Sequence, residues 1–223
     1  FKGEIFLPSR KEKLAERIEW PSFTVVEFFE DKEKMALQQL KACYDALAAG
    51  NGAVLNIRAN YGCGIMATLF GCGLFMMEDP NTLPSSVPVP GGTDDVRRIL
   101  DKGMPDLDSG LGAKVLETDA YYARIMKDYP NLSRYVHIYH PDLQGPLDIC
   151  ELIWGSEMFV GLYEESELAK DFLTLITDTY IAFMRKWMDI VPDRGACTAH
   201  WGYLIKGKIM LRSDSAMNLS PEM

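Results

Sequence analysis

Polar side chains that can exchange protons or bind a charged ligand follow one aromatic-rich run of this sequence. The run YVHIYH has the composition of a strand, is stopped by Pro141, and leads into a polar turn. We predict His140 and Asp142 as catalytic residues, because a nearby carboxylate can tune the protonation of an imidazole. Gln144 offers an amide to a ligand carboxylate or amide, so we predict it as substrate-binding; bracing the turn is its alternative role.

Two further strand-like runs also lead into polar residues. The run AVLNIR lacks polar alternation, which is typical of a strand buried on both faces, and Asn60 and Tyr61 follow it. The run KIMLR ends in Arg212 and precedes Asp214. Loops that follow parallel strands meet at one edge of a sheet. We therefore expect Asn60, Tyr61 and Arg212 to bind substrate and Asp214 to act as a catalytic acid or base, with helix capping an equal alternative for Asp214.

Strands and helices are predicted to alternate along the chain. Apolar periodicity and end signals predict a helical arm and a short extended piece within 1–30. They predict helices over 31–49, 94–100, 111–129, from Pro146 onward, and over 166–191. Strands are predicted over 53–58, 73–78, 135–140 and 208–212. The segment 80–92 is predicted to be a loop. Four strands alternating with helices predict an α/β fold with a parallel sheet.

Composition excludes several classes of partner. The chain has 223 residues and a formal net charge of −9, which argues against a nucleic-acid or anionic-membrane surface. No apolar run reaches the roughly 20 residues of a membrane span, and no signal-peptide pattern is present. Five scattered cysteines without a CxxC pair predict reduced thiols in a cytoplasmic protein.

Two motifs have simpler explanations than the sites they resemble. Gly62, Gly64 and Ala67 match a dinucleotide-binding spacing, but a three-position pattern is common by chance and also fits a tight turn between strand and helix. His137 and His140 are three apart on a predicted strand, so they point to opposite faces. We therefore predict no metal ligand in this chain.

The sequence resembles the uroporphyrinogen decarboxylase superfamily over about residues 35 to 223. The similar segments are Asp-x-Gln-Gly-Pro after a strand, Gly-Ser-Glu at 155–157, a helix beginning Tyr-Glu-Glu-Ser-Glu at 163–167, Asp-Ser-Ala at 214–216, Leu-Ser-Pro-Glu at 219–222 and Phe-Gly-Cys at 70–72. The resemblance implies a (β/α)8 TIM-barrel with its active site at the carboxyl ends of the strands. This chain would be one domain, residues 1–223, made of an arm (1–30) and the first four β/α units (31–223), the N-terminal half of a barrel.

The resemblance implies an enzyme with one of two activities. Decarboxylases of the superfamily carry an acid after strand one, a tyrosine after strand three and a serine after strand four. By the resemblance, the first position falls at Asn60-Tyr61-Gly62, which has no acid. The second falls near Leu152 and the third at Asp214, so the tyrosine and the serine are also replaced. We therefore favour methyl transfer to or from a corrinoid protein or cofactor over decarboxylation of a porphyrinogen in tetrapyrrole biosynthesis. A ligand-binding relative without catalytic activity is the third alternative.

The resemblance also implies cofactors and partners. Zinc and a corrinoid are expected in a full-length methyltransferase, with the zinc ligands beyond residue 223. The expected ligand is a small molecule, a tetrapyrrole or a corrinoid. The expected protein partner is a corrinoid protein, and a homodimer with a second copy of this chain is an open alternative. Four strands supply half of a barrel, so we expect a portion of a longer enzyme or a chain that pairs with another. Alanine at His140 or Asp142 is expected to remove activity with little loss of stability.

Overall fold

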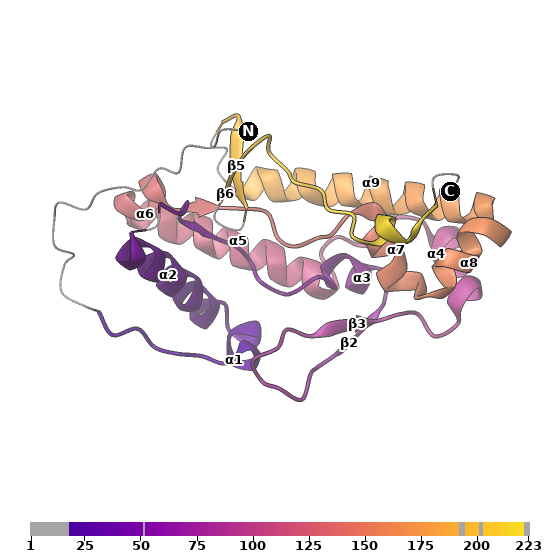
Figure 1. Cartoon of the computed structure of the whole chain (residues 1–223), viewed down its shortest axis with the longest axis horizontal. Helices are drawn as coiled ribbons and strands as arrows, with labels where there is room; N and C mark the ends of the chain where they lie inside the picture. Colours follow the sequence, from indigo (N-terminus) through magenta and orange to yellow (C-terminus); the bar gives the residue numbers. More distant parts are fainter. Residues whose placement is uncertain (1–17, 51, 192–194, 201–202, 221–223) are drawn as a thin grey trace.

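Two long helices run along the length of the molecule, and shorter elements are packed around them (Figure 1). A computed structural model describes residues 18–50, 52–191, 195–200 and 203–220. The long helices are α5 (Gly110–Asp128) and α9 (Ser166–Ile190), and α2 (Lys32–Ala49) lies beside α5. The predicted arm within 1–30 lies largely outside the described residues.

The remaining elements are short. The other helices are α1 (Val25–Glu30), α3 (Ile65–Leu69), α4 (Gly92–Lys102), α6 (Pro130–Tyr135), α7 (Pro146–Trp154), α8 (Glu157–Glu164) and a 3-10 turn, η1 (Ser215–Asn218). The strands are β1 (Asn56–Ile57), β2 (Gly73–Phe75), β3 (Ser85–Val87), β4 (His137–Ile138), β5 (Cys197–His200) and β6 (Tyr203–Lys206). Within the described residues no helix combines the length and the apolar character needed to cross a bilayer.

Helix ends follow the local signals of the sequence. The Asp31 side chain accepts hydrogen bonds from the backbone N–H groups of Glu33 and Lys34, and Gly50 ends α2 in the left-handed conformation at φ 63°. Pro146 opens α7, as predicted, because its missing N–H costs nothing in the first turn. The predicted extended piece before Asp31 is wrong: Thr24 and Glu27 form a capping box, which starts helix α1.

The cap on α2 predicts a measurable stability loss. Replacing Asp31 with alanine leaves two backbone N–H groups without their acceptor, so the free energy of unfolding should fall by about 1 kcal/mol. Urea unfolding would measure this loss. Asp31→Asn is the matched control, since asparagine caps equally well; a loss of the same size in both variants would contradict the capping role.

Strand pairing departs from the predicted parallel sheet. Strands β1 and β4 pair in parallel, with Asn56 opposite His137 and Ile57 opposite Ile138. Strands β2 and β3 pair antiparallel, as do β5 and β6. The expectation of four parallel strands side by side is therefore wrong. Within the described residues the fold is mixed α/β, and these strands do not close a barrel.

Two predicted strands have different structures. The run after Gly73 was expected to be a buried strand, but β2 forms an exposed hairpin with β3, and Phe75 is 55% exposed. The hairpin is possible because Asp79 starts a turn, accepting hydrogen bonds from the backbone of Asn81 and Thr82. The run 208–212 has no strand partner and follows the β5–β6 hairpin as an irregular segment.

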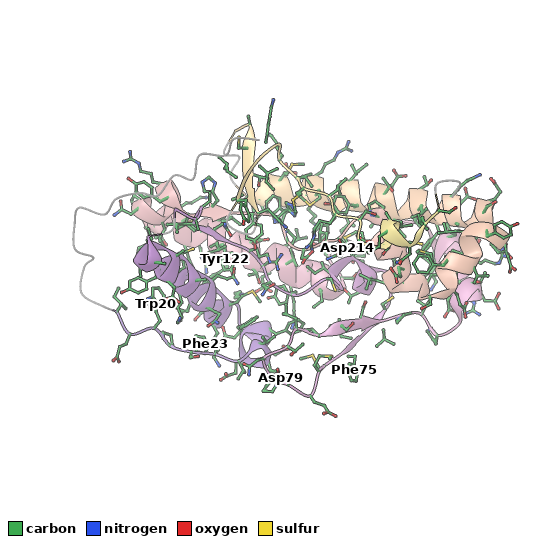
Figure 2. All side chains as sticks on the ribbon, in the orientation of Figure 1. Trp20, Phe23, Phe75, Asp79, Tyr122 and Asp214 are labelled. Carbon is green, nitrogen blue, oxygen red and sulfur yellow. The ribbon has the colours of Figure 1, made fainter. Side chains whose placement is uncertain are left out.

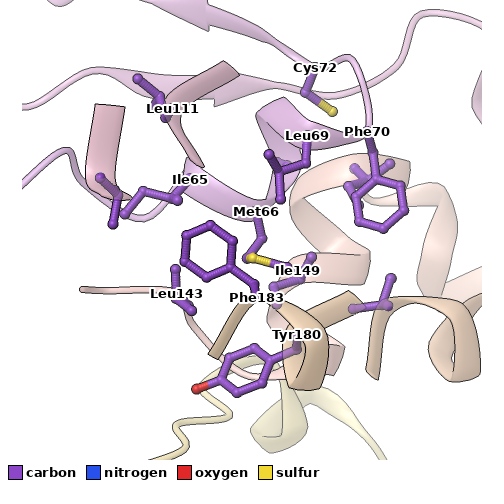
Figure 3. Close-up of a cluster of buried hydrophobic side chains, with 14 of the residues drawn as sticks. Ile65, Met66, Leu69, Phe70, Cys72, Leu111, Leu143, Ile149, Tyr180 and Phe183 are labelled. Atoms are coloured by element: carbon purple, nitrogen blue, oxygen red, sulfur yellow. The ribbon is translucent and has the colours of Figure 1, made fainter. Parts of the chain in front are cut away.

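Helix α3 lies in the centre of the main hydrophobic core. Its residues Ile65 and Met66 are fully buried, and Figure 3 shows them among side chains of α5, α7 and α9. The predicted apolar stripe of α9 includes Phe172 and Phe183, both fully buried in this core. The core therefore holds α3 and α7 rigidly, and the loops on either side of them supply the polar residues considered next.

Candidate functional site

The parallel pair β1–β4 brings two loops to one edge of the molecule. Both strands run in the same direction, so the chain leaves β1 at Arg58 and leaves β4 at Tyr139 on the same side. Arg58 Nη1 lies 3.5 Å from Asp142 Oδ2, and the Arg58 guanidinium lies 5.5 Å from the centre of the Tyr139 ring. This one pair of strands thus brings strand-end residues together, but the residue after β1 that takes part is Arg58 and not the predicted Asn60 or Tyr61.

Asp142 is the centre of a charged cluster at this edge. Its Oδ1 accepts a hydrogen bond of 2.7 Å from Gln144 and contacts Arg212 Nη2 directly. The side chains are mostly buried, with exposed fractions of 13% for Asp142, 11% for Arg58 and 18% for Arg212. The structure therefore brings together three of the predicted site residues, Asp142, Gln144 and Arg212, and adds Arg58, which the sequence interpretation placed inside a strand.

His140 is held in one neutral form by the backbone. Its Nε2 accepts a hydrogen bond of 3.1 Å from Met210 N–H, and its Nδ1 lies 2.9 Å from the Pro141 carbonyl oxygen. Because a carbonyl can only accept, Nδ1 carries the proton. Burial lowers the pKa of His140 below its usual value. His140 remains a predicted catalytic residue, but this arrangement uses both of its nitrogens to bind backbone.

The segment after β6 is anchored across the start of α7. Gly145 approaches the Arg212 carbonyl so closely that a Cβ there would lie 1.9 Å from the oxygen. Asp148 accepts a hydrogen bond of 2.7 Å from Ser215 N–H, and the Ser215 hydroxyl contacts Glu151. These contacts bring Arg212 and η1 beside α7 without a strand at 208–212.

A pocket of about 480 Å³ opens beside this cluster. Its lining includes two predicted site residues, Gln144 and Asp214, and Figure 2 shows Asp214 at the start of η1. The other lining residues are Cys63, Ser86, Pro88, Asp148, Glu151, Leu152, Gly155, Ser156 and Ser215. The volume lies within the usual range for small-molecule sites, and the described lining carries three carboxylates.

Asn60 and Tyr61 lie in different surroundings from the Asp142 cluster. The Tyr61 hydroxyl is 2.8 Å from the Thr118 hydroxyl, and burial raises the pKa of Tyr61. Tyr61 lines a second pocket, of about 420 Å³, together with Lys32 and Lys114. The side-chain oxygen of Asn60 is buried without a hydrogen-bond partner among the described residues. Their substrate-binding roles remain predictions.

Sequence analysis missed a buried acid in α5. Asp119 is fully buried, and its Oδ2 accepts a hydrogen bond of 2.7 Å from Trp187 Nε1. Burial raises the pKa of Asp119 to about 7, more than the hydrogen bonds from Trp187 and the Ala59 backbone lower it. The only signal in the sequence was a charged residue on the otherwise apolar face of a helix.

The described residues contain no cluster of metal ligands, and the glycine motif after β1 forms a tight turn. They contain no group of three or more His, Cys, Asp or Glu side chains placed to hold a metal ion, so zinc does not fit this part of the chain. His200 stacks on His140 with ring centres 5.0 Å apart. Gly62, at φ 79°, and Gly64 allow close contact with the β3 segment, which is the role of a tight turn.

Comparison with known proteins supports the fold alone. No family model matches the sequence. No curated protein matches it either. Among solved structures, a methyltransferase from Methanosarcina mazei is similar, with a TM-score of 0.55 and 19% sequence identity over 77% of this chain and 50% of that chain. The chain thus spans half the length of that methyltransferase and has a similar fold over the matched part.

Proposed function

We propose that this chain is the N-terminal half of a uroporphyrinogen decarboxylase superfamily enzyme that transfers methyl groups to or from a corrinoid protein or cofactor. The single observation that carries the proposal is the shared fold with the methyltransferase from Methanosarcina mazei. The motifs around Asp142 and Asp214 support the superfamily. The free state of all five cysteines supports a cytoplasmic location.

In this proposal the described residues bind and orient a small substrate. Asp214 is exposed at the wall of the pocket, where its carboxylate can accept or return a proton on the bound molecule. Gln144 lines the same pocket and fixes Asp142 by its hydrogen bond. Because zinc does not fit the described residues, we assign no step to a metal on this chain.

Methyl transfer is tested directly with the full-length protein. Methylcobalamin and a small thiol are supplied with zinc, and loss of the methyl–cobalt bond is followed by its visible spectrum. Asp214→Asn should slow transfer at least about tenfold, because it removes a proton acceptor from the pocket. Asp178→Asn is the matched control, since Asp178 is exposed on α9; equal loss in both variants would contradict the role of Asp214.

The same assay separates the alternatives. Carbon dioxide release from a porphyrinogen without methyl transfer would replace the proposal with decarboxylation. Failure of both reactions by a folded protein that still binds a corrinoid or tetrapyrrole would favour a binding protein.

A further inference from the structure

The pocket beside α7 has carboxylates in its wall and no basic side chain. Asp148, Glu151 and Asp214 line it, and its described lining contains no Lys, Arg or His. None of these three carboxylates forms an ion pair with a basic side chain in the described part of the chain. Arg212 interacts electrostatically with Asp214, but it does not line the pocket and its guanidinium contacts Asp142. The pocket therefore has a negative potential, which attracts cations.

Backbone groups fix the Asp148 carboxylate in the pocket wall. Its Oδ1 accepts a hydrogen bond of 2.7 Å from Ser215 N–H, and its Oδ2 accepts one of 3.3 Å from Gly145 N–H. Asp148 also lies in the first turn of α7, where the helix dipole favours negative charge. Both oxygens are thus used by the backbone, so Asp148 contributes charge to the pocket.

Glu151 and Asp214 have acceptor oxygens that no described residue uses. The Ser215 hydroxyl contacts Glu151 Oε2, and Glu151 Oε1 makes no hydrogen bond among the described residues. Asp214 precedes η1, but its side chain does not cap this turn. A carboxylate oxygen can only accept hydrogen bonds. Both side chains can therefore accept hydrogen bonds from a bound molecule.

Two uncharged side chains of the wall also offer acceptors. The Ser86 hydroxyl comes from β3 and is buried without a hydrogen-bond partner among the described residues. A buried hydroxyl of this kind is costly unless another group binds it. Gln144 donates through Nε2 to Asp142, so its carbonyl oxygen is the remaining acceptor of this amide. The pocket thus combines negative charge with a wall rich in hydrogen-bond acceptors.

We propose that this pocket binds the protonated amine of a small substrate. An ammonium group supplies both the positive charge and the N–H donors that Glu151 and Asp214 can bind. A carboxylate in the same place would be repelled by the three acidic side chains. The inference rests on the proposed function in taking this pocket as the substrate site, and it names the substrate class. It also assigns substrate binding to Glu151, which sequence analysis did not predict.

Three ligands of nearly equal size test this preference. Propylammonium, 1-propanol and propionate are titrated into the full-length protein at neutral pH and constant ionic strength, and binding is followed by saturation-transfer NMR. We expect saturable binding of propylammonium, with a Kd on the order of 1 mM, and at least about tenfold weaker binding of the other two. No saturable binding of propylammonium, equal affinity for 1-propanol, or a preference for propionate would overturn the proposal.

Substitutions locate the binding to this pocket. Glu151→Gln removes one negative charge and keeps an oxygen for the Ser215 contact, so it should weaken propylammonium binding about tenfold. Glu167→Gln is the matched control, because Glu167 is 83% exposed on α9 and pairs with Lys170; it should bind as the wild type does. Equal affinity of the wild type and Glu151→Gln would overturn the proposal.

A second substitution decides the question should Glu151→Gln not fold. The exposed Asp214 side chain does not cap η1, so Asp214→Asn should fold. It should weaken propylammonium binding about threefold, less than Glu151→Gln, because solvent screens an exposed charge. Unchanged affinity in Asp214→Asn would then overturn the proposal.

Failure of this inference and failure of the proposed function give different results. Methyl transfer that depends on Asp214, without propylammonium binding, would overturn the amine site alone. Propylammonium binding that depends on Glu151, without methyl transfer, would support the amine site and overturn the proposed function.

Discussion

Replacing Asp119 with asparagine is expected to remove a destabilising contribution that grows as the pH rises from about 4 to 7. The carboxyl is fully buried, with a pKa of about 7 in the folded protein against 3.8 for its ordinary value. Between these values the folded state binds one more proton than the unfolded state. The contribution of Asp119 to the free energy of unfolding therefore falls as pH rises, by about 1.4 kcal/mol per unit, and is constant above pH 7.

The expected difference at pH 8 is large. Full ionisation of Asp119 costs the wild type on the order of 4 kcal/mol relative to pH 4. Asparagine carries no charge at any of these pH values, and its side-chain oxygen can still accept the Trp187 hydrogen bond. The variant should therefore be more stable than the wild type at pH 8, by up to this amount, and the difference between the two proteins should fall towards zero as the pH is lowered to 4. Burial lowers the pKa of His140 and His200, so their contribution to stability rises with pH in both proteins and cancels in this difference.

Urea unfolding at pH 5, 6, 7 and 8 measures this effect. The groups that face Asp119 are Trp187, Tyr61 and Tyr122, and burial raises the pKa of both tyrosines, so they do not titrate in this range. Figure 2 places Tyr122 between α5 and α2. Asp178→Asn, on the exposed side of α9, should keep the wild-type slope. The same slope in Asp119→Asn would show that Asp119 ionises normally.

Replacing Asp142 with alanine should destabilise the protein by about 3–5 kcal/mol, because it leaves Arg58 and Arg212 without their shared carboxylate. Sequence analysis alone led us to expect little loss of stability at this position, and the buried ion pairs change that expectation. Loss of activity in Asp142→Ala is therefore not sufficient to show a catalytic role. Chemical denaturation measures the loss.

A surface ion pair provides the comparison for Asp142. Lys41 and Asp45 are 2.6 Å apart on α2 and well exposed, so Asp45→Ala should cost no more than about 0.5 kcal/mol. Equal losses for Asp45→Ala and Asp142→Ala would contradict the buried cluster. Replacing Arg58 and Asp142 together, with Arg58→Met, should cost less than the sum of the single changes, since the double variant leaves one fewer unpaired charge.

The sequence predicted α2, α4, α5, α7 and α9 because the ends of these helices depend on neighbouring residues, but it did not predict α1, α6 or α8. The cap at Asp31, the glycine at position 50 and the proline at position 146 act within one turn, so their effect is visible without the fold. The apolar stripe of α9 likewise predicted a buried face. Strands were predicted poorly, since an apolar run does not specify its partner: β2 joins an exposed hairpin, and 208–212 has no strand partner.

By itself, the sequence determined the longer helices and which polar residues follow β1 and β4. Tertiary structure alone decided that Arg58 and Arg212 share Asp142. It also decided that the Met210 N–H donates a hydrogen bond to His140 Nε2, and that Asp119 is buried against Trp187. Each of these contacts joins residues far apart in the chain. Their charges and pKa values depend on burial and on partners that no local pattern specifies.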